Sequence, residues 1–117
     1  MGTGLVRKPA DIEEAIRDIV ASDVGNMLSL EELYSIVSVM HKIEELMMGG
    51  LLKEIEMELA KKNNDIVLMA EGMMNTTNRK YEMMVIKKVF IAGGNIETDG
   101  SGKFSMTITI RKGVSRV

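Results

Sequence analysis

The sequence predicts an α+β fold in a single domain of 117 residues. Apolar residues recur at helical spacing in the first half, alternate at strand spacing near the C-terminus, and are separated by turn signals. Because helical and strand-like segments are grouped rather than alternating, we expect two or three N-terminal amphipathic helices on a C-terminal antiparallel sheet of about three strands. We expect flexible tails at 1–8 and 113–117.

The first helix is expected to begin at Pro9–Asp11, where proline and acidic residues suit a first turn, and to stop before Gly25. Its apolar stripe is Ile12, Ala15, Ile16, Ile19 and Val20.

The second helix is expected to begin after Ser29, an N-cap that Glu32 completes as a capping box. Gly49 and Gly50 indicate a break or hinge, because each glycine costs about 1 kcal/mol in a helix interior. A third helix is then predicted over 51–62, with Leu52, Ile55 and Leu59 inside. The alternative is one helix that runs through the glycine pair.

Strands are predicted in the second half of the chain. A turn at 63–65 precedes a short strand at 66–70 and a loop at 72–80. The segment 81–92 is rich in β-formers and is predicted as a long strand. Residues 103–111 alternate, with Phe104, Met106, Ile108 and Ile110 on one face and Ser105, Thr107, Thr109 and Arg111 on the other.

Composition excludes several chemistries. There is no Cys and only 1 His, so a disulfide scaffold, a thiolate zinc site and a cysteine nucleophile are excluded. We predict no catalytic residue, metal or cofactor and hence no enzyme. His41 lacks a nucleophile motif nearby, the paired glutamates are expected on solvent-exposed helix faces, and Gly93–Gly94 lacks the rest of a phosphate loop.

The lack of Cys fits the cytoplasm, and no apolar run is long enough for a membrane span or signal peptide.

Charge is unevenly distributed along the chain, and methionine is unusually frequent compared with aromatic residues. Residues 1–65 hold 7 Lys/Arg and 13 Asp/Glu (−6), whereas residues 66–117 hold 8 and 4 (+4). The chain has 12 Met but 2 Phe, 2 Tyr and no Trp. Methionine can simply fill the core in place of aromatic residues, or it can provide an adaptable contact surface. The candidates for a protein interface are Met40, Met47, Met48, Met73 and Met74.

These features favour a small, non-catalytic, intracellular binding or assembly protein that self-associates, the acidic half of one chain attracting the basic half of another. The alternative is a nucleic-acid-binding regulator, with either a basic sheet surface or a winged helix. In the winged helix, 28–33 would start the second helix of a helix-turn-helix, and a hairpin around Asp99–Gly100 would be the wing. The candidate residues of this regulator are Arg79, Lys80, Lys87, Lys103, Arg111 and Lys112. Against it stand Glu44 and Glu45, which phosphates would repel in the segment where a recognition helix would lie.

Overall fold

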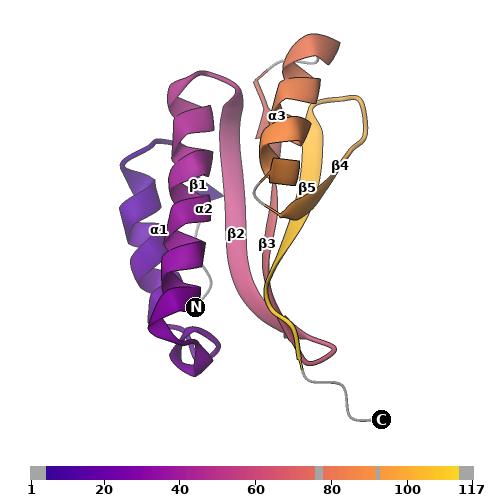
Figure 1. The fold of residues 1–117 in the computed structure, drawn as a ribbon. Helices are drawn as coiled ribbons and strands as arrows, with labels where there is room; N and C mark the ends of the chain where they lie inside the picture. The colour runs from indigo at the N-terminus through magenta and orange to yellow at the C-terminus, as the bar shows by residue number, and fades with distance from the viewer. Residues whose placement is uncertain (1–4, 76–77, 92, 114–117) are drawn as a thin grey trace.

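Within the residues that the structure describes, the fold is α+β, with three α-helices and a five-stranded antiparallel sheet (Figure 1). It is a computed structural model that describes residues 5–75, 78–91 and 93–113. The elements are β1 (Leu5–Val6), α1 (Asp11–Val20), a 3-10 turn (Gly25–Met27), α2 (Leu30–Met48), β2 (Leu52–Lys62), β3 (Asp65–Met74), α3 (Arg79–Ile91), β4 (Gly94–Thr98) and β5 (Lys103–Arg111). The prediction of about three strands was therefore too low, and the helices are not all N-terminal.

The sheet has the order β1-β2-β3-β5-β4, and every neighbouring pair is antiparallel. Asn63 and Asn64 connect β2 to β3 with φ values of 52° and 69°, the left-handed conformation that a two-residue hairpin requires. The turn predicted at 63–65 is confirmed. The strand predicted at 66–70 is also present, but it is longer, because β3 continues into the predicted loop as far as Met74.

The first two helices are confirmed. Ile12, Ala15 and Ile19 are the buried face of α1. The Ser29 hydroxyl accepts the amide proton of Glu32, and the Glu32 carboxylate accepts that of Ser29, so the capping box is present. The helix ends at Met48, and Gly50 leaves the helical path with φ of 77°. Of the two alternatives for the glycine pair, the break is correct.

The helix predicted over 51–62 is wrong, because this segment is strand β2. The ladder between β2 and β3 pairs Leu52 with Met74 and Glu54 with Met73, which leaves Lys53 as an extra residue. This bulge places both Leu52 and Ile55 on the buried face, so their spacing of three resembles a helical period. Beyond the bulge, the segment has the ordinary alternation of a strand.

The strand predicted over 81–92 is also wrong, because Arg79–Ile91 forms α3. The buried residues Glu82, Val85 and Val89 are three and four positions apart, which is a helical period. Apolar side chains occupy the outer face of this helix too. They hide that period in the sequence and place apolar residues on both parities of the expected strand.

The alternation predicted for 103–111 is confirmed with one exception. Phe104, Met106 and Ile108 are buried, and Ser105 is exposed. A register shift pairs Ile66 with Arg111 but Val67 with Thr109, so Ile110 is the extra residue of a second bulge. A bulge re-aims the following side chain. Arg111 therefore points to the same side as the core rather than away from it.

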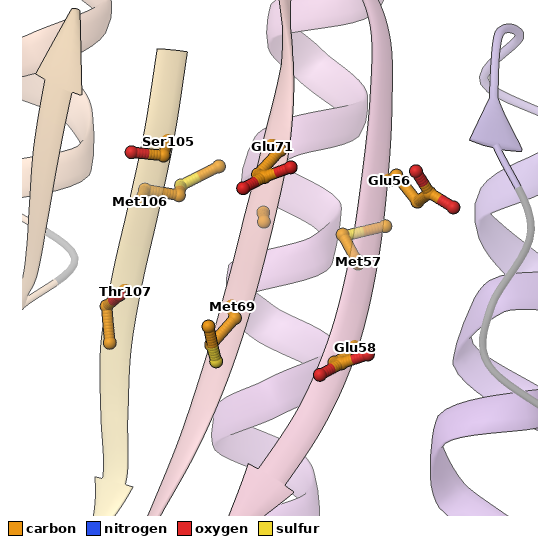
Figure 2. A pocket seen from close by; sticks show the side chains of 9 residues that line it. Glu56, Met57, Glu58, Met69, Glu71, Ser105, Met106 and Thr107 are labelled. Carbon is orange, nitrogen blue, oxygen red and sulfur yellow. The ribbon is translucent and has the colours of Figure 1, made fainter. Parts of the chain in front are cut away.

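The molecule has two layers and extends 21 Å along its shortest axis. The core cluster contains residues of all three helices and of β1, β2, β3 and β5. Gly94 in β4 allows α3 to approach: a side chain there would have its Cβ 2.6 Å from Ile108 Cγ1 and 3.1 Å from Val89 Cγ1. The helices pack on one face of the sheet, and within the described residues the opposite face has no helix over it (Figures 1 and 2).

Candidate functional site

The uncovered face of the sheet has its own pattern of side chains, which the strand register arranges in rows. Glu56 pairs with Glu71, Glu71 with Ser105, and Ser105 with Glu97, so these four lie in one row across β2, β3, β5 and β4. The adjacent row contains Glu58, Met69 and Thr107. We call this the open face; Figure 2 shows its central part.

Negative charge dominates the open face. Glu54, Glu56, Glu58, Glu71 and Glu97 line its two hollows. Glu56 and Glu71 are directly opposite each other, an arrangement of like charges that destabilises a sheet. Lys103 also lines the face, and Arg7 Nε lies 3.8 Å from a carboxylate oxygen of Glu54. The carboxylates therefore outnumber the cations around the hollows.

The two hollows are adjacent. One, of about 480 Å³, lies over Glu58, Met69 and Thr107, and the other, of about 520 Å³, lies over Met73 and Lys103. Glu56, Glu71 and Ser105 line both hollows, which makes one continuous depression across the sheet. Leu5, Met69 and Met73 give this depression an apolar floor among the glutamates.

A second exposed surface lies on α3, opposite its buried residues. Its side chains recur every three or four positions and form one stripe along the helix. They are Lys80, Met83, Met84, Lys87, Phe90 and Ile91. Phe90 and Ile91 are 73% and 69% exposed, and a shallow apolar hollow of about 380 Å³ lies along the stripe. We call this the α3 stripe; exposed apolar side chains that lie together, with polar residues beside them, can mark an interaction site.

A buried carboxylate anchors α3 beside the sheet. Glu82 is 4% exposed, and its Oε1 accepts hydrogen bonds from Arg79 Nη1 at 2.9 Å and from Thr98 Oγ1 at 3.0 Å. Buried charges are stable only when they are paired in this way. The contact ties the first turn of α3 to the end of β4 and so sets which side of the helix faces solvent.

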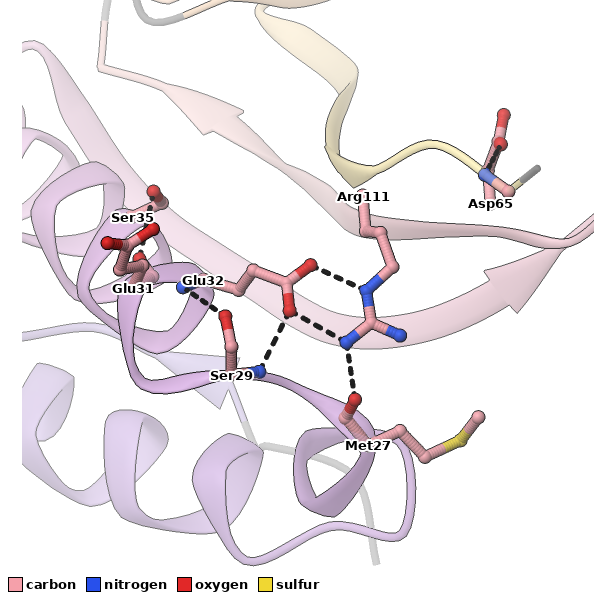
Figure 3. A network of polar contacts seen from close by, with 8 residues as sticks. Met27, Ser29, Glu31, Glu32, Ser35, Asp65 and Arg111 are labelled. Carbon is pink, nitrogen blue, oxygen red and sulfur yellow. Dashed lines mark hydrogen bonds and ion pairs between the residues drawn. The ribbon is translucent and has the colours of Figure 1, made fainter.

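Arg111 donates three hydrogen bonds that join β5 to the start of α2 (Figure 3). Its Nε donates to Glu32 Oε2 at 2.5 Å and its Nη2 to Glu32 Oε1 at 2.7 Å, and Nη2 also donates to the Met27 carbonyl. The hydrogen bonds from Arg111 to Glu32, with that from the Ser29 amide, lower the pKa of Glu32 to about 2, and the Glu32 carboxylate raises the pKa of Arg111. The network joins the end of β5 to the start of α2.

The five methionines predicted as interface candidates are not on one surface. Met40, Met47 and Met74 belong to the core, where they fill space between helices and sheet. Met48 is 69% exposed at the end of α2. Met73 is half-buried and lines the open face. Two of the five are therefore available to a partner, and they lie on different elements.

The six nucleic-acid candidates are also dispersed. Lys80 and Lys87 lie on α3, and Arg79 on the same helix is paired with Glu82. Lys103 stands among the glutamates of the open face. Arg111 is engaged with Glu32, and Lys112 is exposed beyond the end of β5. The fold does not bring these cations together into a basic sheet surface.

Several residues of these two surfaces were missed by sequence reasoning. The open-face glutamates of β2 were assigned to the wet side of a helix, and Met83, Met84 and Phe90 to a strand. The alternation of Glu54, Glu56 and Glu58 with Ile55 and Met57 was the signal that could have identified the first group. The stripe on α3 is visible only once Val85 and Val89 are known to be its buried side.

His41 is exposed, with Nδ1 3.8 Å from a carboxylate oxygen of Glu44. Among the described residues, no three acidic or histidine side chains are grouped as a metal site would require. Of the helices in the described ranges, none combines the length and apolar character needed to cross a bilayer.

Comparisons with protein families, with curated proteins and with solved structures find no match for this chain.

Proposed function

We propose that this chain is a small, non-catalytic binding and assembly protein that acts through protein–protein contacts and associates with copies of itself. One observation carries the proposal: the helices cover one face of the sheet, and the described residues leave the other face open and hollowed. The proposal includes an intracellular, cytoplasmic setting, which a chain without Cys suits.

The composition of the open face supports a contact role. An antiparallel sheet commonly exposes one polar face to water, so exposure alone is ordinary. Here the exposed face also holds Leu5, Met69 and Met73 and the opposed pair Glu56 and Glu71. Carboxylates facing each other cost stability in the isolated chain, and cations from a partner would remove that cost.

The helical side adds a second exposed surface, the α3 stripe, whose composition is apolar and cationic. Met83, Met84, Phe90 and Ile91 are all more than 40% exposed on α3. Aromatic residues and methionine are enriched in protein–protein interfaces, where they supply contact area and adapt to a partner's shape. An acidic face with an apolar floor and an exposed apolar stripe on one small chain favour assembly.

Light scattering coupled to size exclusion, over a wide range of protein concentration, tests this proposal. We expect a mass above the 13.0 kDa of one chain, rising with concentration. Repeating the series at low and high salt separates two contributions, since contacts between exposed charges weaken in salt and apolar contacts do not. A mass of 13.0 kDa at every concentration and salt would contradict self-association.

A further inference from the structure

We propose that self-association occurs head to tail, with the α3 stripe of one copy docked on the open face of a second copy. This inference rests on the function proposed above and names the partner of the open face. It is supported by the charges of the two surfaces, by their apolar content and size, and by their positions on opposite sides of one chain.

The charges of the two surfaces are complementary. Lys80 and Lys87 lie within the α3 stripe, and Lys88 is exposed beside it. The acidic residue of α3, Glu82, is buried on the far side of the helix and already paired with Arg79. The exposed side of α3 is thus cationic, whereas five glutamates surround the hollows of the open face. Such complementarity steers two surfaces together and fixes their orientation.

The apolar parts and the dimensions also agree. The stripe presents Met83, Met84 and Phe90, and the floor of the open face presents Met69 and Met73. At 1.5 Å per residue, the 13 residues of α3 are about 20 Å long. At 3.3 Å per residue, the 10 residues of β3 extend for about 33 Å. The sheet is therefore long enough for the whole helix to lie on it. The docked helix would cover the open face in the way that a second layer of helices covers a sheet in folds with helices on both faces.

Docking between the two surfaces requires a second copy of the chain because of where the surfaces lie. The α3 stripe is on the outside of the helix layer, and the open face is on the other side of the sheet, so they cannot meet within one chain. Each copy consequently offers one surface of each kind. A contact between unlike surfaces leaves one free surface at either end of the assembly. Further copies can therefore add until a ring closes or a filament forms.

Two single variants test the docking. Phe90→Glu places an anion in the α3 stripe, and Met69→Arg places a cation on the open face; both positions contact solvent, so the fold should tolerate them. Tyr34→Glu on α2, which is 68% exposed, is the matched control for the first variant. Ser38→Arg, at an exposed position of α2 and so on the other side of the sheet, is the control for the second. Circular dichroism checks that all four chains are folded.

The expected result is that each test variant alone is monomeric, while both controls associate as the unaltered chain does. A 1:1 mixture of Phe90→Glu and Met69→Arg should then form a complex of two chains and stop there. In this complex the intact α3 stripe of the Met69→Arg chain docks on the intact open face of the Phe90→Glu chain. Salt should weaken this mixed complex by about tenfold or more between 50 mM and 500 mM, because exposed charges are screened.

Other results would overturn the docking. If both test variants associate like the unaltered chain, neither surface is used. If one variant is monomeric, the other is unaffected and mixing restores nothing, a single surface pairs with itself. Both results leave the proposed function standing, because the unaltered chain still associates. A strictly monomeric unaltered chain would instead refute the proposed function and the docking with it.

Discussion

The two faces of the sheet differ in how closely their residues are constrained. On the covered face, Ile55 and Met57 are almost wholly buried, and Gly94 lacks even the space for a methyl group. On the open face, Glu56 and Glu58 alternate with them along the same strand and are exposed. One strand therefore serves two requirements: its inward residues stabilise the fold, and its outward residues are free to be selected for contact with something else.

The largest expected difference between the faces is in stability. Ile55→Ala should lower the free energy of unfolding by about 2–5 kcal/mol, because it removes buried methyl groups and leaves a cavity. Glu58→Ala, at an exposed site on the same strand whose cross-strand partner is Met69, should change it by no more than about 0.5 kcal/mol, as exposed substitutions usually do. Urea denaturation at low protein concentration measures both. Equal losses at the two positions would show that the open face is not free of structural constraint.

The next effect concerns the Arg111 network on the covered side. In the folded chain the pKa of Glu32 is about 2, below its usual 4.5, so the ionised form stabilises the fold. This contribution is complete above about pH 4.5 and is lost as the pH falls toward 2. Glu32→Gln should be less stable near neutral pH and should lose less stability on acidification.

Thermal unfolding from pH 7 to pH 2 checks this prediction. Glu31→Gln is the matched control, since Glu31 is the adjacent, exposed carboxylate on the same helix. If Glu32→Gln and the unaltered chain have parallel pH profiles, the salt bridge does not contribute to stability in solution.

The smallest expected effect has the opposite sign. Glu71→Gln removes the repulsion between Glu71 and Glu56, so it should raise the free energy of unfolding of the single chain by about 0.2–1 kcal/mol. The same change should weaken self-association, because the open face loses a charge. Glu58→Gln, whose cross-strand partner is Met69, is the control for stability. If Glu71→Gln lowers stability, the opposed glutamates do not repel as their geometry implies.

Sequence patterns that depend on neighbouring residues predicted their helix start, turn and strand correctly. They failed in two segments whose secondary structure depends on contacts with distant parts of the chain. The capping box at Ser29 and Glu32, the asparagine turn and the alternation through 104–108 each depend on neighbours in sequence, and each is confirmed. The helix expected at 51–62 failed because a bulge at Lys53 made strand spacing resemble helix spacing. Segment 81–92 failed because β-forming residues occupy a helix whose outer side is apolar as well.

The candidate site was less predictable than the fold. Which glutamates share a row depends on the register of β2, β3 and β5, and no local pattern specifies that register. In the adjacent methionine pairs at 47–48 and 73–74, Met48 and Met73 are the more exposed members. Sequence could not place them on a common surface, and they do not share one.

Gly94 carries a consequence for how α3 is presented. Since the missing side chain lets Val89 and Ile108 come close together, this residue sets the height of the helix above the strands. A larger residue would act as a spacer and lift the helix away from β4 and β5, and the hydrogen bond from Thr98 to Glu82 would stretch with it. A buried position thereby governs how far the side chains of the α3 stripe project from the sheet.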